Sequence, residues 1–111
     1  MIFLSVPYTH IEPEVRRVRT EHATRVMAKL MSDGHVVCCP VVMYHGVDEL
    51  MTRKGTTPSS EYWLGITDNY IDVCDELVVL QLNGWDKSAG VKREIERFAE
   101  REIEPRFMKA V

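Results

Sequence analysis

The sequence has few cysteines, no long apolar run and no excess of positive charge. Only three of its 111 residues are cysteines, Cys38, Cys39 and Cys74, and their spacing matches no common metal site. Adjacent residues of a strand cannot easily pair with each other, so we expect reduced cysteines that pack in the interior. No metal site is expected.

No apolar run approaches the ~18 residues of a membrane-spanning helix, and the N-terminal segment lacks the basic start of a signal peptide. The net charge of −3 leaves no broad basic face for a nucleic acid duplex. We therefore expect neither a membrane nor duplex nucleic acid as a partner. The expected location is the cytoplasm, which would be that of the host if the chain is phage-encoded.

Two phosphate-binding signatures are also missing. No G-x-G-x-x-G follows the first predicted strand, and no Walker lysine loop occurs. Ordinary dinucleotide-dependent or ATP-dependent transfer chemistry is therefore not supported, and we expect no cofactor.

Strand and helix patterns alternate along the chain. The predicted elements are a strand at 2–6, a helix from Pro13 closed by Gly34, a strand at 36–42, a helix from Ser60 to about Cys74, a strand at 77–82, a helix from Ser88 to about 103, and a short strand at 106–109. Pro40 implies an edge position or an early end for the second strand. Residues 44–60 show no clear period and are predicted to form a long loop or lid.

This alternation predicts an α/β fold. Right-handed crossovers would give a small Rossmann-like or flavodoxin-like parallel sheet of about four strands, with helices on both faces and a single domain over residues 1–111. A chain of this size buries a core with little to spare, so we expect a homodimer or a higher homo-oligomer. Ligands of such sheets bind beyond the carboxyl ends of the strands, which here are Pro7-Tyr8, 43–45 and Asn83-Gly84-Trp85.

The segment from Trp85 to Glu94 carries the clearest chemical pattern. Ser88 is a good N-cap, so the free N–H groups of residues 89–91 would face outward and could bind an anion such as phosphate. Gly90 and Glu94 are four residues apart and share a helix face, which leaves open space before the carboxylate. The alternative is that Ser88 only caps the helix and Glu94 is a solvated charge.

Several stretches together resemble the nucleoside 2-deoxyribosyltransferase-like superfamily, which includes deoxynucleoside monophosphate N-glycosidases. They are Ile2-Phe-Leu-Ser-Val-Pro-Tyr-Thr-His, Gly34-His-Val-Val-Cys-Cys-Pro, Asp75-Glu-Leu-Val-Val-Leu and Ser88-x-Gly-x-x-x-Glu94. The first and last are also similar to a small domain family of phages and bacteria. Val6-Pro7 stands where the superfamily has Gly-Pro.

The resemblance implies a glycosyl mechanism centred on Glu94. This carboxylate, expected to have an ordinary pKa and to be ionised at pH 7, would attack the anomeric carbon and displace the nucleobase. The resemblance also implies an aspartate that assists the leaving base, for which Asp68 is the candidate and Asp72 its rival. Tyr8 is expected to hydrogen-bond Glu94 or the ribose.

Ser88 bears on the substrate. Base-exchanging transferases of the superfamily carry an aspartate at this position, which would repel a phosphate at the helix N-terminus, whereas the monophosphate hydrolases carry serine. The resemblance therefore implies an N-glycosidase of a nucleoside 5′-monophosphate, with possible base transfer. The expected substrate-binding residues are Ser88, Ala89, Gly90, Pro7, His10, His45, Gly84 and Trp85, of which Trp85 would stack on a base or pack in the core.

Two other functions stay open at this point. The same pocket could belong to a module that binds a nucleotide or a nucleotide-derived signal without catalysis. It could also hydrolyse a dinucleotide such as NAD, since the glycosyl chemistry is alike.

Overall fold

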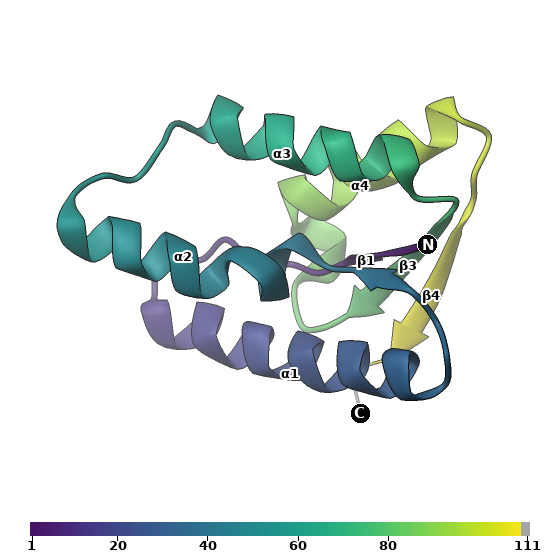
Figure 1. Ribbon diagram of the computed structural model, residues 1–111, viewed down its shortest axis with the longest axis horizontal. Coiled ribbons are helices and arrows are strands. Elements are labelled where there is room, and N and C mark those ends of the chain that lie inside the picture. The colour runs from purple at the N-terminus through teal and green to yellow at the C-terminus, as the bar shows by residue number, and fades with distance from the viewer. Residues whose placement is uncertain (110–111) are drawn as a thin grey trace.

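The computed structural model describes residues 1–109, in which helices and strands alternate as predicted (Figure 1). The elements are β1 (Ile2–Ser5), α1 (Pro13–Ser32), β2 (Val37–Cys38), α2 (Pro40–Lys54), α3 (Ser60–Val73), β3 (Glu76–Gln81), the 3-10 turn η1 (Trp85–Lys87), α4 (Ala89–Glu100) and β4 (Pro105–Lys109). The last two residues of the predicted domain, 110–111, lie outside the described part.

The four strands form one parallel sheet in the order β2-β1-β3-β4. The central strands are mostly apolar, apart from Ser5 in β1 and Glu76 and Gln81 at the ends of β3, because both strands are covered on both faces. This confirms the predicted α/β class with a small Rossmann-like parallel sheet. The order also places the end of β1 between the end of β2 and the end of β3, which decides how the site residues are distributed.

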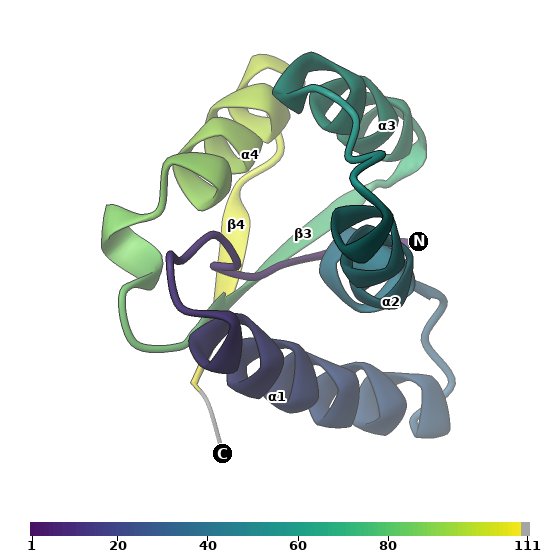
Figure 2. The ribbon, with the colours of Figure 1, turned by 90° about the vertical axis from the view of Figure 1, so that its left-hand side faces the viewer.

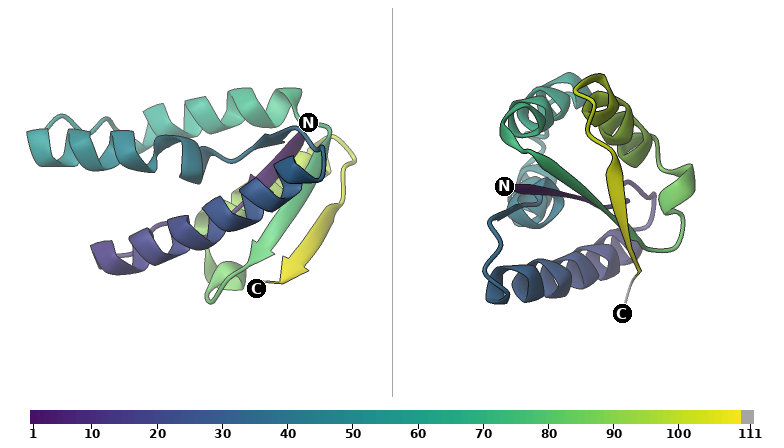
Figure 3. Two further views of the ribbon diagram at one scale, coloured as in Figure 1. Left: turned by 60° about the horizontal axis from the view of Figure 1, so that its bottom comes forward. Right: turned by 90° about the vertical axis from the view of Figure 1, so that its right-hand side faces the viewer.

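Helices cover both faces of the sheet, as Figures 2 and 3 show. On one face α1 and α2 pack against side chains of β1 and β3 that include Leu4 and Leu80. On the other face α3 and α4 pack against a second cluster, in which Phe3 contacts Phe98 with ring centroids 5.7 Å apart. The three cysteines are buried and free, as expected for packing residues.

The strand predicted at 36–42 is present but contains only Val37–Cys38, as β2. The loop or lid predicted for residues 44–60 was wrong, because α2 occupies residues 40–54. Pro40 takes the first helical position, where its fixed φ suits a helix and its missing N–H is not needed. Gly55 ends the helix in the left-handed conformation at φ 70°.

No residue of α2 is fully buried, which explains why the sequence showed no helical period there. Pro40 does end the β2 ladder early, and β2 is an edge strand, so that part of the prediction is confirmed. The last helix also ends earlier than predicted, at Glu100, because Ile103 N–H turns back to the Phe98 carbonyl.

Within residues 1–109, none of the helices combines the length and the apolarity that crossing a membrane requires.

Candidate functional site

Glu94 lies at the carboxyl end of β1, on the inner side of α4. Val91 and Phe98 of the same helix are buried in the core, and Glu94 follows Val91 by one turn on that side. Its Oε1 accepts a hydrogen bond of 2.5 Å from the hydroxyl of Ser5, the last residue of β1. The helix therefore holds this carboxylate against the sheet and not in bulk solvent.

Burial raises the pKa of Glu94 to about 7, against a smaller opposite effect from the Ser5 hydrogen bond and the charge of Arg93. The side chain is half-buried, so solvent still reaches part of it. The expectation of an ordinary pKa was wrong, because spacing along the helix could not show that Ser5 and the sheet enclose the carboxylate. At pH 7 the group divides between its acid and its anion.

Ser88 caps α4 as predicted. Its Oγ accepts a hydrogen bond of 3.2 Å from the Val91 N–H, and the next two residues, Ala89 and Gly90, are exposed. A Cβ placed at Gly90 would meet only the Ser88 Oγ, at 3.8 Å. The first turn of α4 is therefore open to a ligand, on the same helix as Glu94.

Asp68 is held by arginines of α4. Its carboxylate lies 2.8 and 2.9 Å from two Arg93 nitrogens, and Arg97 lies 3.9 Å away. The Arg93 hydrogen bonds lower the pKa of Asp68, so it is an anion across the neutral range. Its rival Asp72 is more exposed and approaches Arg97 at 3.9 Å. In this arrangement Asp68 joins α3 to α4 and is no free proton donor, contrary to the expected role.

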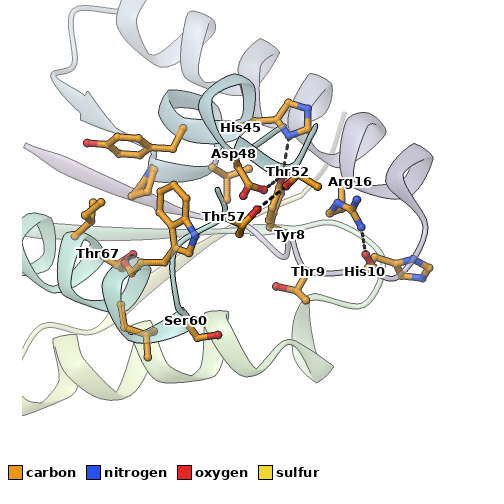
Figure 4. Close-up of a pocket in the computed structure, with 16 residues that line it drawn as sticks. Tyr8, Thr9, His10, Arg16, His45, Asp48, Thr52, Thr57, Ser60 and Thr67 are labelled. Atoms are coloured by element: carbon orange, nitrogen blue, oxygen red, sulfur yellow. Dashed lines mark hydrogen bonds between the residues drawn. The ribbon is translucent and has the colours of Figure 1, made fainter. Parts of the chain in front are cut away.

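A cavity of about 520 Å³ opens beside β1, between the turn after this strand, α2 and α3 (Figure 4). Its polar lining residues include Tyr8, His10, Arg16, His45, Asp48 and Thr67, and its apolar ones include Val41, Tyr44, Trp63, Leu64 and Ile66. The volume is in the range of small-molecule pockets. Three of the expected site residues, Tyr8, His10 and His45, line it.

Tyr8 contacts two residues of α2 and not Glu94. Its hydroxyl lies 2.8 Å from His45 Nδ1 and 3.3 Å from Asp48 Oδ2, and Figure 4 shows the three side chains together. Burial, with the nearby charge of Asp48, raises the pKa of Tyr8 to about 12, so the phenol keeps its proton. Of the two expected partners of Tyr8, Glu94 is not its partner, because α2 supplies His45 and Asp48 instead, and the contact with a ribose stays a prediction.

His10 lies at the other side of the cavity, near Arg16. Its Nδ1 accepts a hydrogen bond of 3.0 Å from the Glu12 N–H, and its carbonyl accepts one from Arg16 (Figure 4). His45 also approaches Glu49, with Nε2 3.3 Å from its carboxylate. Both histidines therefore line the cavity, and their contact with a ligand stays a prediction.

Pro7, Gly84 and Trp85 do not line this cavity. Pro7 is fully buried beneath the turn. Gly84 has φ +88°, and a Cβ there would meet Arg19 at 3.1 Å, so glycine serves the turn and a close packing contact. Trp85 packs on Phe107 of β4 with ring centroids 5.3 Å apart. Of the two roles considered for Trp85, packing is the one that the contacts favour.

Glu94 lies next to the cavity without lining it. Burial raises the pKa of Cys39 to about 12, and the negative charge of Glu94 adds to this effect. Cys39 directly precedes Pro40, which lines the cavity. The Ser5 hydrogen bond places the carboxylate at the end of β1, and the turn after this strand contributes Tyr8 to the cavity.

The sequence did not point to Asp48, Tyr44, Trp63 or Arg16 as site residues. Trp63 lies within the helix predicted from Ser60 to about Cys74, where an aromatic residue usually signals packing. Asp48 and Tyr44 lie on α2, and their convergence with Tyr8 depends on that unpredicted helix. A search for polar residues at helical spacing between Pro40 and Gly55 could have found them.

Within residues 1–109, no three side chains of His, Cys, Asp or Glu cluster in a way that could hold a metal ion. The sequence model of one family, described as "Domain of unknown function (DUF1937)", matches residues 1–109. Comparison with curated proteins gave no match.

Proposed function

Because the chain belongs to the DUF1937 family, whose description names no function, we propose a function from its site: an N-glycosidase that cleaves the base from a nucleoside 5′-monophosphate. The nucleophile is Glu94. The proposal also rests on the resemblance of the sequence to nucleoside 2-deoxyribosyltransferases. This resemblance makes a deoxynucleotide the preferred substrate.

The observation that carries this proposal is the hydrogen bond between Glu94 and Ser5. This bond fixes the carboxylate at the carboxyl end of a central strand, beside a cavity of about 520 Å³. Ligands of parallel sheets bind at this end of the strands. The Ser5 bond orients one oxygen and leaves the other able to react. Its pKa of about 7 keeps a large share of the group ionised at neutral pH.

In the proposed reaction, a Glu94 oxygen attacks C1′ of the sugar while the bond from C1′ to the base nitrogen breaks. The electron pair of that bond leaves with the base, which takes up a proton. The negative charge of Glu94 stabilises the oxocarbenium-like transition state. Water then attacks C1′ of the glycosyl ester and frees the sugar phosphate and Glu94, whereas attack by a second base would give transfer.

The first turn of α4 is the proposed phosphate position. The Ser88 hydroxyl, the exposed Ala89 and Gly90 and the positive end of the helix dipole favour an anion there. The rise from Ser88 to Glu94 is roughly 9 Å at about 1.5 Å per residue, which is close to the span of a sugar phosphate.

A second candidate function is a module that binds a nucleotide without cleaving it. Two of the three expected catalytic groups are engaged elsewhere, Asp68 with Arg93 and Tyr8 with His45. A site in which only Glu94 remains available is compatible with binding alone. Under this alternative, Glu94 contacts the ligand and breaks no bond.

A cytoplasmic location and a homodimer or higher homo-oligomer belong to the same proposal. Three buried free cysteines fit a reducing compartment. An open site edge, as at Gly90, could be completed by a second copy. Light scattering coupled to size-exclusion chromatography measures the oligomeric state directly.

The function is tested by incubating the protein with ribo- and deoxynucleoside 5′-monophosphates, nucleosides and NAD, and detecting free base by liquid chromatography. We expect the protein to release base from monophosphates, and we expect Glu94→Gln to abolish this release. Glu96→Gln is the matched control, because Glu96 is exposed on the same helix. Full activity of Glu94→Gln would overturn the proposal, and thermal stabilisation by a nucleotide without any base release would favour the binding module.

A further inference from the structure

The cavity beside β1 has one aromatic and apolar side. Tyr44 of α2 and Trp63 of α3 lie with ring centroids 6.0 Å apart and planes tilted by 60°, and Leu64 and Ile66 extend this wall. The Tyr44 hydroxyl lies 2.8 Å from that of Tyr70, so its polar end is already satisfied. Such a wall suits a flat ring that can pack against an aromatic side chain.

The other side is polar and carries both donors and acceptors. Tyr8 has one hydroxyl proton but two neighbouring acceptors, His45 Nδ1 and the Asp48 carboxylate. When the phenol donates to His45, the Asp48 carboxylate keeps its capacity to accept a hydrogen bond from a ligand. The trio therefore offers acceptor atoms to an N–H group, next to the phenolic oxygen.

The charge of the lining argues against a phosphate in this cavity. Arg16 and Asp48 carry opposite charges, and the Arg16 guanidinium is engaged with the His10 carbonyl. The occupant that fits both sides is thus an uncharged, flat heteroaromatic ring with hydrogen-bonding groups along one edge. A nucleobase has this chemistry.

The strand order fixes the direction in which a nucleotide would lie. β1 runs between β2 and β3, so its end, with Ser5 and Glu94, separates the start of α2 from the start of α4. The cavity is on the α2 side, and Ser88 is on the α4 side. A nucleotide across this edge would have its base in the cavity, its C1′ beside Glu94 and its phosphate at Ser88.

We propose that this cavity is the base-binding site, with the ring against Trp63 and its polar edge read by Tyr8, His45 and Asp48. The inference rests on the proposed function for the position of the sugar phosphate, but base binding itself requires no catalysis. It assigns base selection to α2, and it replaces Trp85 with Trp63 as the stacking residue.

The two tryptophans of the chain give a matched test. Free adenine, guanine, hypoxanthine, cytosine, thymine and uracil are titrated into the protein while tryptophan fluorescence is recorded. We expect at least one base to quench the fluorescence, the quench to be lost in Trp63→Phe, and the quench to persist in Trp85→Phe. Circular dichroism checks that each variant is folded.

A second variant tests the polar edge. Asp48→Asn replaces an acceptor by a donor in nearly the same volume, so the affinity for the preferred base should fall about 10-fold and the order of preference among bases should change. Deoxyribose 5-phosphate should bind with unchanged affinity in calorimetry. Asp33→Asn is the control, since Asp33 is exposed at the far end of α1 and does not line the cavity.

The outcomes separate the two proposals. Quenching that disappears in Trp85→Phe and persists in Trp63→Phe would overturn the assignment. The assignment would also be overturned if Asp48→Asn left the selectivity of base release from nucleotides unchanged. Base binding at Trp63 without base release from any nucleotide would support the base site while the N-glycosidase function fails. No fluorescence or heat change with any base would overturn the inference, even if nucleotides are cleaved.

Discussion

Asp68 of α3 and Glu94 of α4 are carboxylates with chemically opposite surroundings. Glu94 lies against the sheet with a neutral hydroxyl, and burial raises its pKa to about 7. Asp68 faces Arg93, and this partner lowers its pKa. A carboxylate paired with an arginine holds two helices together, whereas an enclosed one without such a partner is available for chemistry. This difference supports the proposal that Glu94 is the reactive group.

The largest expected difference between the two carboxylates is in catalysis. Glu94→Gln removes the proposed nucleophile and should lower kcat for base release by at least ~10³-fold. Asp68→Asn should lower it by less than ~10-fold, because Asp68 acts only through the packing of α3 on α4. Both rates are measured by chromatography of the released base. Equal losses in the two variants would mean that Asp68 shares the chemistry.

The two substitutions, Glu94→Gln and Asp68→Asn, should change the stability of the protein in opposite directions. The folded pKa of Glu94 is raised above its usual 4.5, so its stabilising contribution is complete below pH 4.5 and is lost as the pH rises through about 7. Glu94→Gln avoids the buried charge and should raise the free energy of unfolding at pH 8 by on the order of 3 kcal/mol, with little change at pH 4.5.

Asp68→Asn should instead destabilise the protein at pH 8, by on the order of 1 kcal/mol, since it leaves the part-buried Arg93 without its anion. Urea unfolding followed by circular dichroism at both pH values measures the two effects. A Glu94→Gln protein that is less stable than wild type at pH 8 would show that its carboxylate is not desolvated.

The pH dependence of activity provides a third contrast. In the proposed reaction Glu94 must be ionised to attack, so kcat/KM should rise about tenfold per pH unit below 7 and level off above it. The lower limb should be unchanged in Asp68→Asn. A rate that is constant between pH 5 and 8 would assign the chemistry to a group with an ordinary carboxyl pKa.

The smallest expected effect comes from Ser5→Ala. The Ser5 hydroxyl favours the anion of Glu94, so its loss should raise the pKa of Glu94 further and move the lower limb of the pH profile to higher pH. At pH 7 the activity should fall several-fold and recover at pH 9. Loss at both pH values would give Ser5 a role in binding beyond this bond.

Local patterns predicted one half of this site well. The cap at Ser88 follows from the pattern of a single helix, and the parallel sheet follows from the alternation of strands and helices along the chain, and the structure contains both. The other half depends on α2, which has no fully buried residue and therefore no apolar period to reveal it. His45 and Asp48 follow Tyr8 by 37 and 40 residues along the chain, and only the fold brings the three together.

The protonation states of Asp68 and Glu94 could not be predicted from the sequence either. Asp68 and Glu94 are both helix carboxylates, and nothing in their spacing shows that one would meet Arg93 and the other Ser5. Burial and partner identity depend on tertiary contacts between α3, α4 and β1.

The most direct measurement is a titration of the side-chain carboxyl carbons by NMR, with Glu94→Gln and Asp68→Asn used to assign the two signals. We predict that Glu94 titrates near pH 7 and that Asp68 titrates below the usual range of aspartates, in the same sample and without any substrate. A Glu94 signal that titrates at its usual value of 4.5 would contradict the account, because the carboxylate would then be neither enclosed nor distinct from the other acidic residues of the surface.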